Sequence, residues 1–214
     1  MTVNYVIRAE VVDLRNDNPK QDDTFLVDTN IWYWLTYTRA SQSGQPPVPY
    51  QSTDYPAYIA KAIFKKAKLL RCGLSLIELA SLIEKSEKDI FERTAGFSKG
   101  SLGLKVYRHN YLSERNNVVS EIQASWGQIK IMAAPIDLLL DEQTTEAILN
   151  KLGSQSIGGY DMPLLETIAK AGLIQIITDD GDFATVPDIQ VFTANTNVIQ
   201  KARSIGKLTM RNGP

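Results

Sequence analysis

The chain has 214 residues, of which 43% are hydrophobic and 22% are charged, and its net charge is −1. This composition is that of an ordinary globular protein, and the near-zero charge excludes a polycation that coats nucleic acid. One cysteine and one histidine leave almost no material for a disulfide, a zinc cluster or a histidine-based triad. The lone cysteine, and a sequence without a signal peptide or a membrane-length apolar run, predict a cytoplasmic protein.

Hydrophobic patterning predicts strands that alternate with helices along the chain. Strands are expected at residues 3–14, 25–27, 135–140, 173–178 and 189–193, with a brief strand or turn at 72–74. Helices are expected at residues 28–35, 58–70, 75–90, 104–134, 142–152, 160–171 and 198–204. This order predicts an α/β fold with a mostly parallel central sheet.

Four segments are expected to lie outside the minimal α/β core. Residues 1–24 form an N-terminal extension that contains a strand, and residues 206–214 form a tail. Residues 41–56 combine several prolines with a glycine, which predicts a lid or flap rather than a structureless loop. Residues 84–134 carry more helix than such a core needs, which predicts a helical insertion.

Four acidic residues stand where an apolar strand ends or a helix begins. Asp28 and Asp180 follow expected strands, whereas Glu78 and Asp161 lie in the first turns of expected helices. In a parallel sheet the carboxyl ends of the strands share one edge, so residues just beyond them can converge. Converging carboxylates repel one another, and a hard cation such as Mg²⁺ or Mn²⁺ relieves that repulsion. The pattern therefore predicts a divalent metal site.

Each acid also has a purely structural interpretation. Asp28 suits an N-cap, Glu78 fits a capping box with Ser75, and Asp161 suits the start of a helix. Residues 179–182 can form an Asp-Gly turn at the surface, whereas an EF-hand is excluded because its twelfth position would not be Glu. The order of the four acids, rather than any one of them, favours the metal site.

Taken together, these segments resemble the PIN domain, the nuclease fold of VapC-type toxins and related ribonucleases. The matching segments are residues 25–31, 76–79, 160–169 and 177–183. The resemblance implies a three-layer PIN-like nuclease domain over residues 25–205. It implies that Mg²⁺ or Mn²⁺ is held by the catalytic residues Asp28, Glu78, Asp161 and Asp180, with Asp182 as a fifth ligand and Asn30 and Thr178 in support.

The implied activity is metal-dependent hydrolysis of phosphodiester bonds in single-stranded or structured RNA. A divalent ion held by carboxylates can activate a water and neutralise charge on a phosphate oxygen. Lys61, Lys65 and Lys68 share one helical face and are expected to follow the RNA backbone, although such clusters are usually solvated surface. Membership of a toxin–antitoxin pair is one version of this function.

Two other functions remain open at this point. A haloacid-dehalogenase-like phosphohydrolase would use Asp28 as its nucleophile, but Asn30 stands where that family has a second Asp and Lys170 is placed mid-helix. A PIN-like module could also bind RNA or protein without cutting. The aromatic residues within 32–58 are numerous enough to predict an apolar patch that receives an antitoxin or a second copy of the chain.

Overall fold

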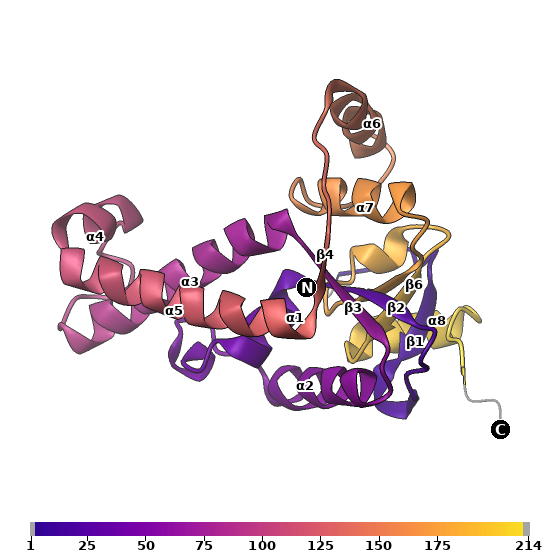
Figure 1. The fold of residues 1–214 in the computed structure, drawn as a ribbon, viewed down its shortest axis with the longest axis horizontal. Coiled ribbons are helices and arrows are strands. Elements are labelled where there is room, and N and C mark those ends of the chain that lie inside the picture. The colour runs from indigo at the N-terminus through magenta and orange to yellow at the C-terminus, as the bar shows by residue number, and fades with distance from the viewer. Residues whose placement is uncertain (1–2, 212–214) are drawn as a thin grey trace.

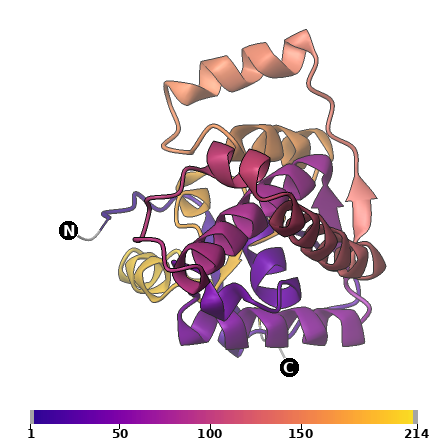
Figure 2. The same ribbon diagram turned by 90° about the vertical axis from the view of Figure 1, so that its left-hand side faces the viewer.

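A computed structural model describes residues 3–211 and shows a parallel sheet covered by helices on both faces (Figures 1 and 2). The strands are β1 (Glu10–Asp13), β2 (Thr24–Val27), β3 (Lys68–Cys72), β4 (Ala134–Ile136), β5 (Gln175–Ile177) and β6 (Gln190–Thr193). Their order across the sheet is β1-β6-β5-β2-β3-β4, and every neighbouring pair is parallel. The α/β class and the mostly parallel sheet expected from the sequence are confirmed.

The helices form the outer layers and one long projection. They are α1 (Thr29–Thr36), α2 (Pro49–Phe64), α3 (Gly73–Thr94), α4 (Leu104–Asn110), α5 (Leu112–Met132), α6 (Glu142–Leu152), α7 (Asp161–Lys170) and α8 (Thr196–Ser204), with 3-10 turns η1 (Leu14–Asn16), η2 (Ala40–Gln42) and η3 (Phe183–Thr185). Figure 1 shows the outer part of α3, all of α4 and much of α5 extending away from the sheet, as expected of a helical insertion. No helix within residues 3–211 is both long and apolar enough to cross a membrane.

Alternating side chains of β2 divide the core between the two faces of the sheet. Phe25 and Val27 pack into a cluster shared with α1, α2, α3 and α5. Leu26 points to the other face, where it packs with residues of α7. A strand that is apolar on both faces is what a sheet covered on both sides requires. The three-layer arrangement follows directly from this pattern.

The aromatic residues of α1 and α2 belong to the core rather than to a surface patch. Trp32, Tyr33, Tyr37, Tyr55 and Tyr58 are all buried. Trp34 and Tyr50 are only partly buried, and both pack against that cluster. Most of the aromatic residues within 32–58 are therefore core, because α1 is enclosed by α2, α3 and α5, and a partner surface in this region stays a prediction.

Two local predictions fail for identifiable reasons. The Pro-rich segment becomes helical at Pro49, where a proline suits the first helical position and the Gln51 side chain accepts from the Val48 N–H at 3.0 Å. Only the stretch between η2 and α2 remains irregular, so no flap extends to residue 56. The expected helix 58–70 instead ends at Phe64, because Lys66 adopts φ 62° and turns the chain into β3.

Candidate active site at the carboxyl edge of the sheet

Asp28 lies at the junction of β2 and α1, and its carboxylate is 3% exposed. It occupies the N-cap position of α1, yet its side chain makes no capping hydrogen bond. Instead, Thr178 Oγ1 donates to Asp28 Oδ2 at 2.7 Å. The two residues meet because β2 and β5 are neighbours in register, with Val27 opposite Ile177. A cap therefore does not explain this buried carboxylate.

Glu78 lies in the second turn of α3 and not at its start. The helix begins at Gly73 with Cys72 as its N-cap, so Ser75 is inside the helix and the expected capping box does not form. The sequence pattern misplaced this start because β3 runs directly into α3 without a connecting loop. Glu78 is half-buried, and its side chain does not cap the helix.

Asp161 is the first residue of α7, as the sequence predicts. An acid in the first turn interacts favourably with the helix dipole, so the helix-start interpretation holds for its position. Gly158 lies close to this carboxylate, since a Cβ at that residue would be in ordinary contact with Asp161 Oδ2 at 3.5 Å. The carboxylate is half-buried at the same edge of the sheet.

The acids after β5 have separate tasks. Asp179 accepts from Tyr55 Oη at 2.6 Å and from Gln51 Nε2 at 2.7 Å, which fastens the start of α2 to the end of β5. Asp180 accepts from the backbone N–H of Asp182 at 2.9 Å. Its own N–H donates to Thr178 Oγ1 at 3.0 Å. Thr178 thus supports both Asp28 and Asp180, as expected of it.

The carboxylates share one electrostatic field. Burial raises the pKa of Asp28 to about 7, against the lowering effect of the Thr178 hydrogen bond, and Glu78, Asp161 and Asp180 raise it further. Burial raises the pKa of Asp161 to about 7, with contributions from Asp180, Glu78 and Asp182. The pKa of Asp182 is also raised, by burial and then by Asp180. The acids therefore interact electrostatically, and their convergence on one metal ion stays a prediction.

These carboxylates do not form a closed coordination sphere. Across residues 3–211, no three Asp, Glu, His or Cys side chains are arranged so that they could hold a metal ion. The two observations are compatible, because charges interact over distances well beyond the roughly 2.0–2.6 Å at which Mg²⁺ or Ca²⁺ ligands bind. The cluster has the charge that a divalent cation would neutralise, and its oxygens would have to draw together around the ion.

The lysines predicted to bind RNA lie elsewhere. Lys61, Lys65 and Lys68 are exposed. Lys68 pairs with Thr24 at the start of β2, which is the amino edge of the sheet. With a rise of about 1.5 Å per residue, α2 carries Lys65 roughly 20 Å from Gln51, which touches Asp179. The structure does not bring these lysines together with the acids.

Tyr5, which lies near the acids, and Lys85 of α3 were not singled out from the sequence. The ring of Tyr5 lies so close to Gly181 that a Cβ there would be 2.3 Å from Tyr5 Cζ. Burial raises the pKa of Tyr5, and the charges of Asp180, Asp182 and Asp179 raise it further. No motif marks Tyr5, whereas Lys85 could have been found by its spacing of seven residues, two helical turns, from Glu78.

No family model and no curated protein sequence matches this chain. The function must therefore be inferred from the residues at this edge of the sheet.

Proposed function

We propose that the chain is a metal-dependent ribonuclease that hydrolyses phosphodiester bonds in RNA. The observation that supports this most strongly is the pair Asp28 and Asp161, whose pKa values are both raised to about 7 within one acidic cluster. Such a cluster destabilises its own charged state unless a cation neutralises it. A protein of this kind would act in the cytoplasm, where the free and buried Cys72 stays reduced.

The chain's own residues would divide the work as follows. Asp28, Glu78, Asp161 and Asp180 would hold Mg²⁺ or Mn²⁺, with Asp182 at the margin because Asp180 accepts from its backbone. The bound ion would supply Lewis acidity toward a phosphate oxygen and a water of lowered pKa. Thr178 would keep Asp28 oriented and ionised, since its hydrogen bond lowers the pKa of that carboxyl.

The phosphohydrolase alternative has less support. Lys170, the only lysine considered for its active site, donates to Thr144 Oγ1 and lies 3.8 Å from Asp141 Oδ1, in a contact between α7 and the start of α6. Asn30 replaces the second acid that this chemistry needs, and it lines a cavity instead. A phospho-aspartate on Asp28 would be the observation that favours it.

The antitoxin expectation has less support, because most of the aromatic residues that were to receive a partner are packed in the core. We therefore propose the nuclease activity without assigning a toxin role or a homodimer. A module that binds RNA without cutting it remains the competing function, and only an activity measurement separates the two.

The experiment is cleavage of a fluorescent single-stranded RNA by the purified protein with Mg²⁺, with Mn²⁺ and with EDTA. Asp28→Asn, purified in parallel, keeps the size of the side chain and an oxygen that can accept from Thr178. The variant should fold normally. Its cleavage rate should fall by more than the roughly 100-fold that loss of a contact to a metal ligand costs. Equal cleavage by parent and variant would identify a contaminating nuclease and reject the proposal.

A further inference from the structure

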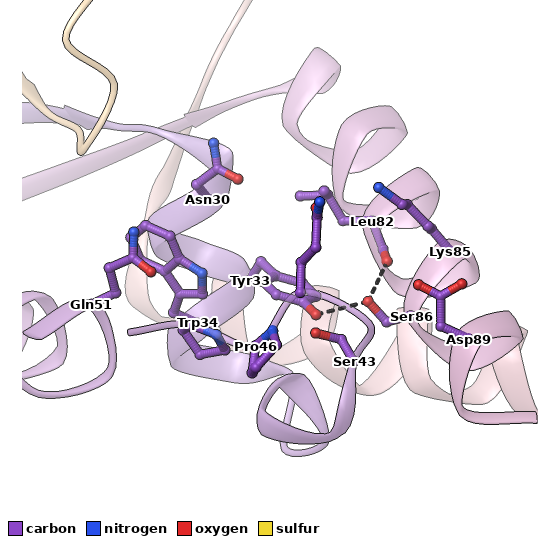
Figure 3. A pocket seen from close by; sticks show the side chains of 12 residues that line it. Asn30, Tyr33, Trp34, Ser43, Pro46, Gln51, Leu82, Lys85, Ser86 and Asp89 are labelled. Carbon is purple, nitrogen blue, oxygen red and sulfur yellow. Dashed lines mark hydrogen bonds between the residues drawn. The ribbon is translucent and has the colours of Figure 1, made fainter. Parts of the chain in front are cut away.

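A cavity of about 270 Å³ opens beside the acidic cluster, between α1, α3 and the segment that joins η2 to α2. Figure 3 shows the side chains that surround it, which come from all three of these parts. Its lining includes Asn30, Trp34, Gln45, Gln51, Lys85 and Ser86. The volume lies just below the roughly 300 Å³ at which pockets for drug-sized ligands begin, so it suits one small planar group with a polar rim.

The cavity and the acidic cluster are connected through the same helices. Asn30 is two residues beyond Asp28 on α1. Lys85 lies two turns beyond Glu78 on α3, which places both on one side of that helix. Gln51 lines the cavity while its Nε2 donates to Asp179, which directly precedes Asp180. These connections make the cavity a neighbour of the acids, at a position that suits a nucleotide next to the one whose phosphodiester meets them.

The lining combines an aromatic ring, amides and the exposed cation of Lys85. Trp34 is half-buried and Lys85 is exposed. Asn30 and Gln51 each carry an amide that can donate and accept hydrogen bonds at the edge of a base. Aromatic rings bind unstacked bases, and lysines bind the phosphates that join them. This is the set of contacts that one nucleotide of a single strand requires.

The rest of the cavity is fixed by internal contacts. Tyr33 Oη and Ser86 Oγ share a hydrogen bond of 2.8 Å, and Ser86 Oγ donates to Leu82 O. Asp89 pairs with Lys88 at 2.9 Å, which offsets the one carboxylate in the lining. These contacts leave a preformed wall, in which Ser43 Oγ is buried without a hydrogen-bond partner among residues 3–211.

We propose that this cavity binds the base of a nucleotide next to the cleaved phosphodiester, with Trp34 stacking on the base and Lys85 contacting its phosphate. This inference rests on the proposed nuclease function and names its substrate as single-stranded RNA. A duplex does not fit, because its bases are stacked and paired and cannot enter a pocket of this size.

The test measures equilibrium binding of a fluorescein-labelled single-stranded RNA to the Asp28→Asn protein in Mg²⁺, so that cleavage does not interfere. A series of the same RNA carries one abasic residue at each position in turn. In the Asp28→Asn background, Trp34→Ala should weaken binding about 5- to 150-fold, the range for loss of one stacked base. It should also abolish the penalty of the abasic residue at one position.

Trp34 also packs on Tyr55, with ring centroids 5.6 Å apart, so a second variant guards against a folding defect. Lys85→Gln changes an exposed side chain. It should reduce the slope of log affinity against log salt concentration by about the amount that one phosphate contact contributes. Phe64→Ala and Lys130→Gln are the matched controls, because both residues are exposed and neither lines the cavity. Thermal unfolding of each variant confirms that it is folded.

Binding that is unchanged by Trp34→Ala, or that is indifferent to every abasic position, would overturn the base pocket. Weaker binding by the Lys85→Gln variant, with unchanged binding by the Trp34→Ala variant, would also overturn the base pocket. It would show a phosphate contact without a base contact. Either result leaves the cleavage activity standing. Conversely, pocket-dependent binding by a parent protein that never cleaves RNA would reject the proposed nuclease and keep the pocket.

Discussion

Thr178 Oγ1 donates a hydrogen bond of 2.7 Å to Asp28 Oδ2, which joins the ends of two adjacent strands across 150 residues of sequence. The same hydroxyl oxygen accepts from the backbone N–H of Asp180 at 3.0 Å. One buried side chain therefore positions two of the four acids and lowers the pKa of one of them. The hydrogen bond to Asp28 favours the ionised state that a cation needs.

Thr178→Val should impair catalysis with little change in shape. Valine fills nearly the same volume but cannot donate, so the pKa of Asp28 should rise further and less of it should be ionised at neutral pH. We expect RNA cleavage at pH 7 to fall about 10- to 100-fold, with partial recovery at higher pH. Thr178→Ser, which keeps the hydroxyl, should retain most activity, and equal rates for Val and Ser would contradict this role.

The metal-free protein should lose stability as pH rises toward 7. The pKa values of Asp28 and Asp161 are raised from 3.8 to about 7, so the folded state binds more protons than the unfolded state between those limits. The unfolding free energy contributed by these groups is thus present below pH 4 and declines through pH 7. Thermal unfolding in EDTA should show this decline in stability. The Asp28→Asn variant should show a shallower decline, and it should be more stable than the parent at pH 8. Parallel pH profiles for the two proteins would contradict it.

Glu78→Gln tests the position of this residue beyond the first turn of α3. No helix cap depends on Glu78, because Cys72 is the N-cap and makes no side-chain capping bond. We expect the melting temperature to be unchanged or slightly raised, since one charge leaves a crowded cluster, while RNA cleavage falls sharply. A clear loss of stability together with full activity would return Glu78 to a structural role.

Gly44→Ala should disturb the wall of the cavity from the side remote from the acids. A Cβ at Gly44 would lie 2.4 Å from Asp89 Oδ2, so the Asp89 carboxylate has to move away from its present position beside Lys88. We expect a loss of at most about 1 kcal/mol of stability and weaker RNA binding. Asp89→Ala in the same chain should recover much of the loss by making room, and additive effects of the two changes would rule out this contact as the cause.

The architecture could be predicted because local pattern and tertiary packing agree. Phe25, Leu26 and Val27 read as a strand buried on both faces, and they form one. The positions of Asp28 and Asp180 followed from the rule that parallel strands end at a common edge, whereas Asp161 was found as the start of a helix. The acids could be found because each stands next to a run of apolar residues that is itself easy to recognise.

The remainder required the three-dimensional structure. Pro49 starts a helix in a segment whose composition predicted a lid or flap, and the Gln51 side chain that accepts from the Val48 N–H at this start also donates to Asp179. Lys66 ends α2 in a left-handed conformation, which is usually predicted from a glycine, and no glycine stands at this position. The aromatic side chains of α1 looked too numerous for a core, yet α2, α3 and α5 enclose them, and such long-range contacts leave no local signature.

Calorimetric titration of the parent protein with Mn²⁺ at pH 7, in two buffers of different ionisation enthalpy, tests the acidic cluster most directly. Because Asp28 and Asp161 have pKa values of about 7, a cation that binds them must displace protons. We predict saturable binding with net proton release, and weaker binding with less proton release for Asp28→Asn. Absence of binding in the parent, or equal affinity and proton release in the variant, would contradict a carboxylate-held metal site.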